Sequence, residues 1–281
     1  MRLNIELPGW LENCRPDDAL YADAYEGTPA ELRALLKTAL AFAFHRWPLA
    51  DDEKHVSLTS ARAGFRHSES SSPAAWAIAS LGPGFASPAR LLAALAPAIL
   101  AGVGRILIVS ESPFSPAVCT ALELAGLEDS FLLDKEQMPG FYEDLRALCP
   151  DGRVLAFPSA DGTFTEAQQE LMHSAALDGM PRLRDLPSPR LLCLHEAGSI
   201  EEERLHWLYP DAEFLSEAAP DIRAAYTPEE MPGLDDIPFV CGPGMEACWP
   251  GPSPEFFRNC TCSASFFKEN PSEERPSEDP S

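Results

Sequence analysis

Four consecutive pieces decide the fold of this chain: WAIASL (76–81), the turn GPG (82–84), SPARLLAALAPAILA (87–101) and RILIVS (105–110). The first and last pieces are short apolar runs bounded by turn residues, which is typical of parallel strands buried on both faces. Between them, Ser87 and Pro88 suit the start of a helix, and Gly102 suits its end. These pieces therefore predict one β-α-β unit with two parallel strands.

The alternation of strands and helices continues beyond Ser110. The pattern predicts helices over 115–124, 139–148, 163–177 and 199–207, and strands over 130–133, 153–157 and 190–194. Such alternation favours a parallel sheet that helices cover on both faces. The predicted fold class is therefore α/β, with a Rossmann-like parallel sheet.

The segments on either side of this core differ in character. Residues 1–72 are predicted to form a helical and loop segment, in which a helix begins at a capping box of Thr28 and Glu31 and residues 50–72 are a polar, loop-rich connection. The α/β core spans 73–220. The Pro-rich segment 221–267 is expected to pack on the core, and the acidic tail 268–281 is expected to be disordered.

Charge and cysteine usage narrow the class of protein. The chain has 281 residues, and its 44 acidic and 21 basic side chains give a formal net charge of −23, which repels nucleic acids and anionic membranes. Neither a secretion signal nor an apolar run long enough to span a bilayer is visible. The 8 scattered cysteines then favour reduced thiols. We predict a cytoplasmic protein without nucleic-acid or membrane partners.

The motifs of the β-α-β unit resemble those of histidinol dehydrogenases. The matching runs are AIASLGPG (77–84), SPARLLAALAPAILAGV (87–103), ILIVS (106–110) and ALELAGL (121–127). Two later runs agree in order: SIEEERLHWLYPDAEFL (199–215) and GPSPEFFRNCTCSASFFK (251–268). The resemblance implies a shortened, divergent member with an aldehyde dehydrogenase-like or histidinol dehydrogenase-like fold.

The resemblance also implies that the family's chemistry is altered. The Glu-His pair that moves protons in this family corresponds to Asp211 and Ala212, so Asp211 is the candidate base that remains. Among the residues of this chain, only Asp236 matches one of the family's zinc ligands. Zinc is therefore not expected. His195, which follows a predicted strand, is a second candidate for acid-base catalysis.

Nucleotide binding stays open on the same basis. The resemblance places Ser80 at a cofactor-contact position of the family. Gly82, Gly84 and Ser87 are candidate contacts for a different reason, because a turn before a helix N-terminus suits a phosphate. The usual tyrosine is replaced by Ser80, however, and the block with the family's other dinucleotide contacts is missing. A plain strand-to-helix connection is the favoured interpretation of the turn, so NAD remains an open cofactor.

A cluster of four thiols provides an independent hypothesis. Cys241, Cys248, Cys260 and Cys262 are closely spaced, and thiolates can hold zinc. The two thiols of Cys260-x-Cys262 lie on one face of a strand, so they need further ligands from elsewhere. Buried or incidental cysteines are the favoured interpretation.

Three hypotheses for the function follow from these observations. The leading one is a divergent histidinol dehydrogenase-like protein that does not oxidise histidinol and binds a small molecule or a partner. The second is an active NAD-dependent oxidoreductase acting on another small alcohol or aldehyde. The third is a non-catalytic interaction module, and the oligomeric state stays open in all three.

Overall fold

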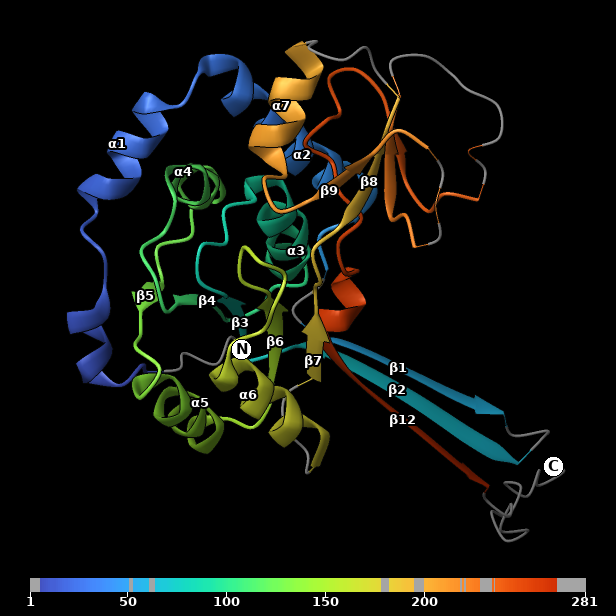
Figure 1. Cartoon of the computed structure of the whole chain (residues 1–281). Helices are drawn as coiled ribbons and strands as arrows, with labels where there is room; N and C mark the ends of the chain where they lie inside the picture. The colour runs from blue at the N-terminus through green and yellow to red at the C-terminus, as the bar shows by residue number, and fades with distance from the viewer. Residues whose placement is uncertain are drawn as a thin grey trace, which may run out of the picture.

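A five-stranded parallel sheet forms the centre of the molecule (Figure 1). The strands stand in the order β5 (Ser130–Leu132), β4 (Arg105–Ser110), β3 (Trp76–Leu81), β6 (Gly152–Phe157) and β7 (Arg182–Asp185). The chain winds outward from β3 to β5 and then returns to β6 on the other side of β3, which is the doubly wound order. The predicted α/β class with a Rossmann-like parallel sheet is confirmed.

The computed structural model describes residues 6–50, 53–60, 64–177, 182–194, 200–217, 219, 221–227, 234 and 236–266. The predicted disordered tail, 268–281, lies outside the described residues. None of the helices described combines the length and the apolar character that crossing a bilayer requires.

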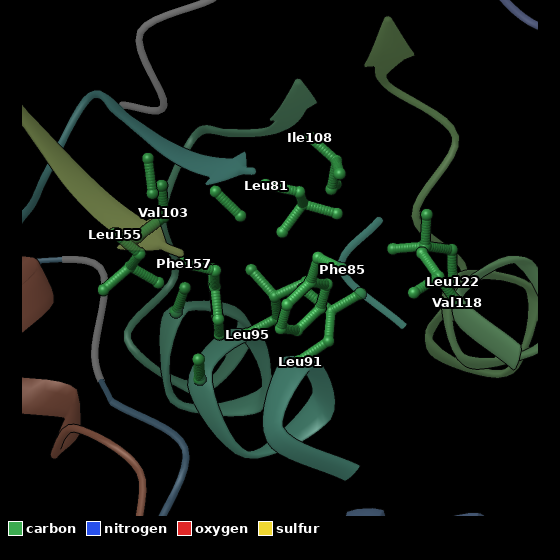
Figure 2. Close-up of a cluster of buried hydrophobic side chains, with 14 of the residues drawn as sticks. Leu81, Phe85, Leu91, Leu95, Val103, Ile108, Val118, Leu122, Leu155 and Phe157 are labelled. Carbon is green, nitrogen blue, oxygen red and sulfur yellow. The ribbon is translucent and has the colours of Figure 1, made fainter. Parts of the chain in front are cut away.

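Helices cover both faces of this sheet. The two layers are α3 (Pro88–Leu100) with α4 (Pro116–Ala125), and α5 (Gln137–Leu148) with α6 (Glu166–Leu177). Side chains of β3 alternate between them, because successive residues of a strand point to opposite faces: Ala79 and Leu81 pack with the first layer, and Trp76 and Ile78 with the second. Figure 2 shows the first layer, where Leu81 and Ile108 from the strands meet side chains of α3 and α4, among them Leu91, Leu95, Val118 and Leu122.

A second parallel sheet follows the first along the chain. Its strands stand in the order β11 (Val240–Cys241), β10 (Ala224–Tyr226), β8 (Arg190–Cys193) and β9 (Glu213–Leu215). The helices α2 (Ala30–Arg46) and α7 (Ile200–Leu208) pack with this sheet, and Leu92 of α3 joins the same cluster. The alternating pattern predicted the strand over 190–194 but not that it starts a separate sheet. Helix α3 is therefore shared between the two sheets.

An antiparallel three-stranded arm extends away from the two sheets (Figure 1). The arm consists of β1 (Lys54–Ser60), β2 (Phe65–Pro73) and β12 (Arg258–Phe266), with β2 in the middle. The prediction of a loop-rich connection over 50–72 is therefore wrong. Most of β1 and β12 is exposed. Apolar and polar residues alternate in both strands, as at Val56 and Leu58, but the run is short in β1, and β2 consists mostly of polar residues, which favoured a loop.

The N-terminal elements pack on different parts of the core: the 3-10 helix η1 (Gly9–Cys14) contacts β5, α1 (Ala19–Gly27) packs on α4, and α2 packs on α3. A second 3-10 helix, η2 (Pro254–Phe257), precedes β12. The predicted cap at Thr28 is wrong in detail, because α2 begins after Pro29 without a side-chain cap. The hydroxyl of Thr28 instead donates to the carbonyl of Ala24, 2.8 Å away, and lies 2.8 Å from the hydroxyl of Thr120 in α4.

Candidate functional site

A cavity of about 380 Å³ lies where the chain passes from the first sheet to the second. The connection from β7 to β8, residues 186–189, forms one wall. Helix α3 contributes Arg90 and Ala94, and the segment from Trp249 to Pro252, which belongs to neither sheet, forms another wall. Because residues of β7 and β8 also line it, the cavity is bounded by elements of both sheets.

Four arginines line this cavity in a chain whose net charge is −23: Arg90, Arg184, Arg190 and Arg223. Arg190 forms an ion pair with Glu213, with 2.8 Å between Nε and Oε2. Arg184 and Arg223 have no ion-pair partner within the described part of the chain. Two aspartates, Asp185 and Asp221, also line the cavity. Arg184 and Arg223 are therefore the two lining guanidinium groups without an ion-pair partner among the described residues, and a guanidinium group suits an anion.

Arg90 lies at the buried side of the cavity and forms an ion pair with Asp211. The two side chains are 3% and 4% exposed. Nη2 of Arg90 also donates to the carbonyl oxygen of Pro187, 2.8 Å away, and to that of Leu186. Burial lowers the pKa of Arg90 to about 9, so the guanidinium stays charged at neutral pH.

The predicted base, Asp211, is thus placed beside the cavity but is bound to a guanidinium. Its Oδ2 accepts from Arg90, and its Oδ1 is buried without a hydrogen-bond partner in the described part of the chain. The neighbouring Ala212 carries no group that could move a proton. The arrangement holds a charged carboxylate in place rather than presenting it to a ligand.

The predicted cofactor residues lie at the carboxyl ends of β3 and β6, where the direction of winding reverses. The two loops there are joined by backbone hydrogen bonds, from Gly82 to Phe157 (2.9 Å) and from Ala160 to Pro83 (3.0 Å). A Cβ atom at Gly82 would collide with the backbone of Ser159. The absence of a side chain at Gly82 therefore serves loop packing.

The remaining cofactor candidates also bond within the protein. Ser80 is buried and accepts from Nε2 of Gln168 through its carbonyl (3.0 Å) and its hydroxyl (3.2 Å). The buried hydroxyl of Ser87 donates to the carbonyl of Leu208, 2.8 Å away, and does not cap α3. The amide of Gly84 donates to the hydroxyl of Ser112, 3.2 Å away. The prediction that α3 starts at Ser87 and Pro88 is confirmed, because Ser87 is the N-cap residue, but its side chain makes no capping hydrogen bond.

The other predicted site residues do not join this group. Asp236 is exposed and belongs to no set of three potential metal ligands among the described residues. His195 lies outside the described residues. The four thiols are split, because Cys241 and Cys248 are buried with the second sheet whereas Cys260 and Cys262 are exposed on the arm.

The cavity arginines were missed in the sequence. One signal was available: Arg90 stands in the first turn of α3, where a positive charge is unfavourable because the helix dipole is positive at that end. A basic residue at such a position indicates a tertiary partner. No comparable local signal marks Arg184 or Arg223.

No family model and no curated protein matches the sequence. Among solved structures, histidinol dehydrogenase from Elizabethkingia anophelis is similar with a TM-score of 0.55 and 11% identity, over 90% of this chain and 77% of that chain. Betaine aldehyde dehydrogenase from Staphylococcus aureus has a TM-score of 0.37 and 14% identity, over 66% of this chain and 39% of that chain. The likeness to histidinol dehydrogenase is a distant relationship of fold, and the predicted resemblance is confirmed at that level.

Proposed function

We propose that this chain is a divergent relative of the histidinol dehydrogenases that binds a small anionic molecule between its two sheets and does not oxidise histidinol. The observation that carries the proposal is the pair Arg184 and Arg223, which line the cavity without an ion-pair partner among the described residues. Guanidinium groups bind carboxylates and phosphates through paired hydrogen bonds. The cavity volume of about 380 Å³ suits a small metabolite.

The burial of Asp211 and its ion pair with Arg90 support the loss of the family's oxidation chemistry. A general base must reach the proton that it removes and must be able to accept it. Asp211 is 4% exposed and is bound to Arg90, so protonation of its carboxylate would leave a buried guanidinium without its counter-charge. That cost opposes a role as a base.

The packing around β3 supports the absence of a dinucleotide from the usual crevice. In doubly wound folds a dinucleotide binds outside the carboxyl ends of the strands, where the winding reverses. Here the loops after β3 and β6 bond to one another at that place. The hydroxyls of Ser80 and Ser87 are engaged within the protein. These contacts favour a structural role for the Gly82-Pro83-Gly84 turn.

The donor set around Asp236 does not fit the zinc ion that the family implies. Zinc takes about four nitrogen, oxygen or sulfur ligands, and Asp236 has no two such partners grouped with it among the described residues. A catalytic zinc ion at Asp236 would therefore lack its other protein ligands among the described residues.

Calorimetric titration of the full chain tests the anion site. Inorganic phosphate and malonate are the probes, and we expect one of them to bind with one equivalent per chain. Arg184→Gln and Arg223→Gln should each weaken that binding by about tenfold, because each removes one charge-assisted contact. Arg146→Gln is the matched control, since Arg146 is exposed on α5 and does not line the cavity.

Two results would contradict the proposal. Equal affinities in the Arg184→Gln and Arg146→Gln variants would remove the cavity as the binding site. Zinc-dependent reduction of NAD with histidinol as substrate would show that the family's reaction persists. Binding of NAD in a separate titration would favour the second hypothesis, an active oxidoreductase with another substrate.

A further inference from the structure

Three side chains with different donor atoms meet on one face of the arm: His67 and Glu69 of β2 and Cys262 of β12. Glu69 lies directly opposite Cys262 in the antiparallel pairing. His67 stands two residues from Glu69 on the same strand, so both side chains point to the same face. The register of the arm therefore brings together an imidazole, a carboxylate and a thiol.

The distances within this group suit a shared ion. Sγ of Cys262 lies 3.8 Å from Nδ1 of His67, and Oε1 of Glu69 lies 3.0 Å from Nε2 of the same ring. One potential ligand atom from each residue lies within 4.8 Å of the other two. Zinc bonds of about 2.0–2.3 Å place neighbouring ligands at similar separations. Cys262 and Glu69 lie against different nitrogens of the His67 ring, so a rotation of this partly exposed imidazole would bring one nitrogen to an ion shared with the other two residues.

The exposure of two thiols on the arm also supports a metal site. Cys260 and Cys262 are the two exposed cysteines among the 8 of the chain. Free cysteine is among the most buried residue types, and an exposed thiol is open to oxidation. Binding to a metal would hold the thiolate of Cys262 in a defined state.

We infer that the arm binds a divalent transition metal of the zinc class through His67, Glu69 and Cys262, with water completing the coordination. One nitrogen, one oxygen and one sulfur ligand suit such an ion better than magnesium or calcium, which prefer oxygen alone. The site is independent of the anion cavity and of the family's zinc position. His67 and Glu69 of the neighbouring strand join Cys262, whereas Cys260 is not one of the three grouped ligands.

Titration of the reduced, chelator-treated full chain with Co²⁺ tests this site. A thiolate bound to cobalt gives a charge-transfer band in the near ultraviolet, and we expect it to saturate at one equivalent. Zn²⁺ should remove the band by competition. Cys262→Ser should abolish the band, and His67→Gln and Glu69→Gln should each weaken cobalt binding by about tenfold or more.

Cys260→Ser is the matched control, because Cys260 is exposed on the same face of β12. It should retain the band and the affinity. Thermal unfolding of the metal-free variants should match that of the unaltered chain, since all three side chains lie on an exposed arm. A missing band in the unaltered chain, or equal loss in the Cys260→Ser and Cys262→Ser variants, would overturn the assignment.

Discussion

Arg90 and Asp211 form a buried ion pair between residues 121 positions apart in the chain. Arg90 belongs to α3, which packs on the first sheet, and Asp211 follows α7, which packs with the second. The same guanidinium bonds to the carbonyls of Leu186 and Pro187 in the connection between the sheets. The pair therefore fixes the position of one sheet relative to the other.

Removing one partner of this pair should destabilise the protein strongly. Arg90→Met leaves the carboxylate of Asp211 buried without its counter-charge, at an expected cost of about 3–5 kcal/mol in the free energy of unfolding. Urea unfolding followed by circular dichroism measures this cost. The double variant Arg90→Met with Asp211→Leu should recover much of it, because neither charge remains.

The more exposed pair of Arg190 and Glu213 is the control for this experiment. Arg190→Met should cost less than about 1 kcal/mol, because water already solvates both charges. Comparable losses of unfolding free energy in the Arg90→Met and Arg190→Met variants would show that the buried pair stabilises the protein no more than the exposed pair does.

A methyl group at Gly251 should also destabilise the protein. A Cβ atom there would collide with the carbonyl of Ala93 in α3, so Gly251→Ala should cost about 1–3 kcal/mol through overpacking. Gly140→Ala should instead stabilise the protein. Gly140 lies within α5 with open space around it, and alanine favours a helix by about 0.5–1 kcal/mol. Thermal unfolding of both variants measures the contrast.

Thiol labelling should separate the cysteines into two classes. In the reduced, metal-free native chain, Cys260 and Cys262 should react rapidly with a disulfide reagent, because they are exposed. The other cysteines, which are buried or partly buried, should react more slowly until urea unfolds the chain. The Cys260→Ser, Cys262→Ser double variant should lose the rapid phase, and a persisting rapid phase would contradict the placement of the thiols.

The stability of the fold should fall as the pH rises above about 9. Burial raises the pKa of the Cys241 thiol to about 12, with the charges of Cys248 and Glu246 adding to the effect. Between its unfolded and folded pKa values this thiol is ionised in the unfolded chain and protonated in the native one, so the unfolded state gains relative stability as the pH rises.

Urea midpoints at about pH 8 and about pH 10 check the sign of this effect. The midpoint of the unaltered chain should be lower at the higher pH. Cys241→Ala should reduce the difference between the two midpoints, because the variant has no thiol to ionise at this position. An unchanged difference would assign the pH dependence to other groups.

Much of the fold could be predicted because its elements carry local patterns. The runs 76–81 and 105–110 are strands in the structure, and 88–100 is a helix within the predicted range. The arm could not be predicted in the same way. Its strands are largely exposed, and they are held by cross-strand bonds such as that between Ser70 and Thr261, 191 residues apart.

The candidate site depended still more on tertiary structure. The resemblance selected Asp211, which follows α7, but its partner Arg90 lies on α3 and was not identified. Arg184 and Arg223 were not identified either, because they line one cavity only when the two sheets pack together.

The α/β class could be predicted from local patterns, because apolar runs and helical spacing act over a few residues and need no distant partner. Which charged side chains come into contact depends on the tertiary structure. It bound Asp211 to Arg90, left Arg184 and Arg223 around a cavity, and brought His67 beside Cys262. Such encounters depend on the packing of elements far apart in the chain, and the one local signal for them is the basic Arg90 in the first turn of its helix.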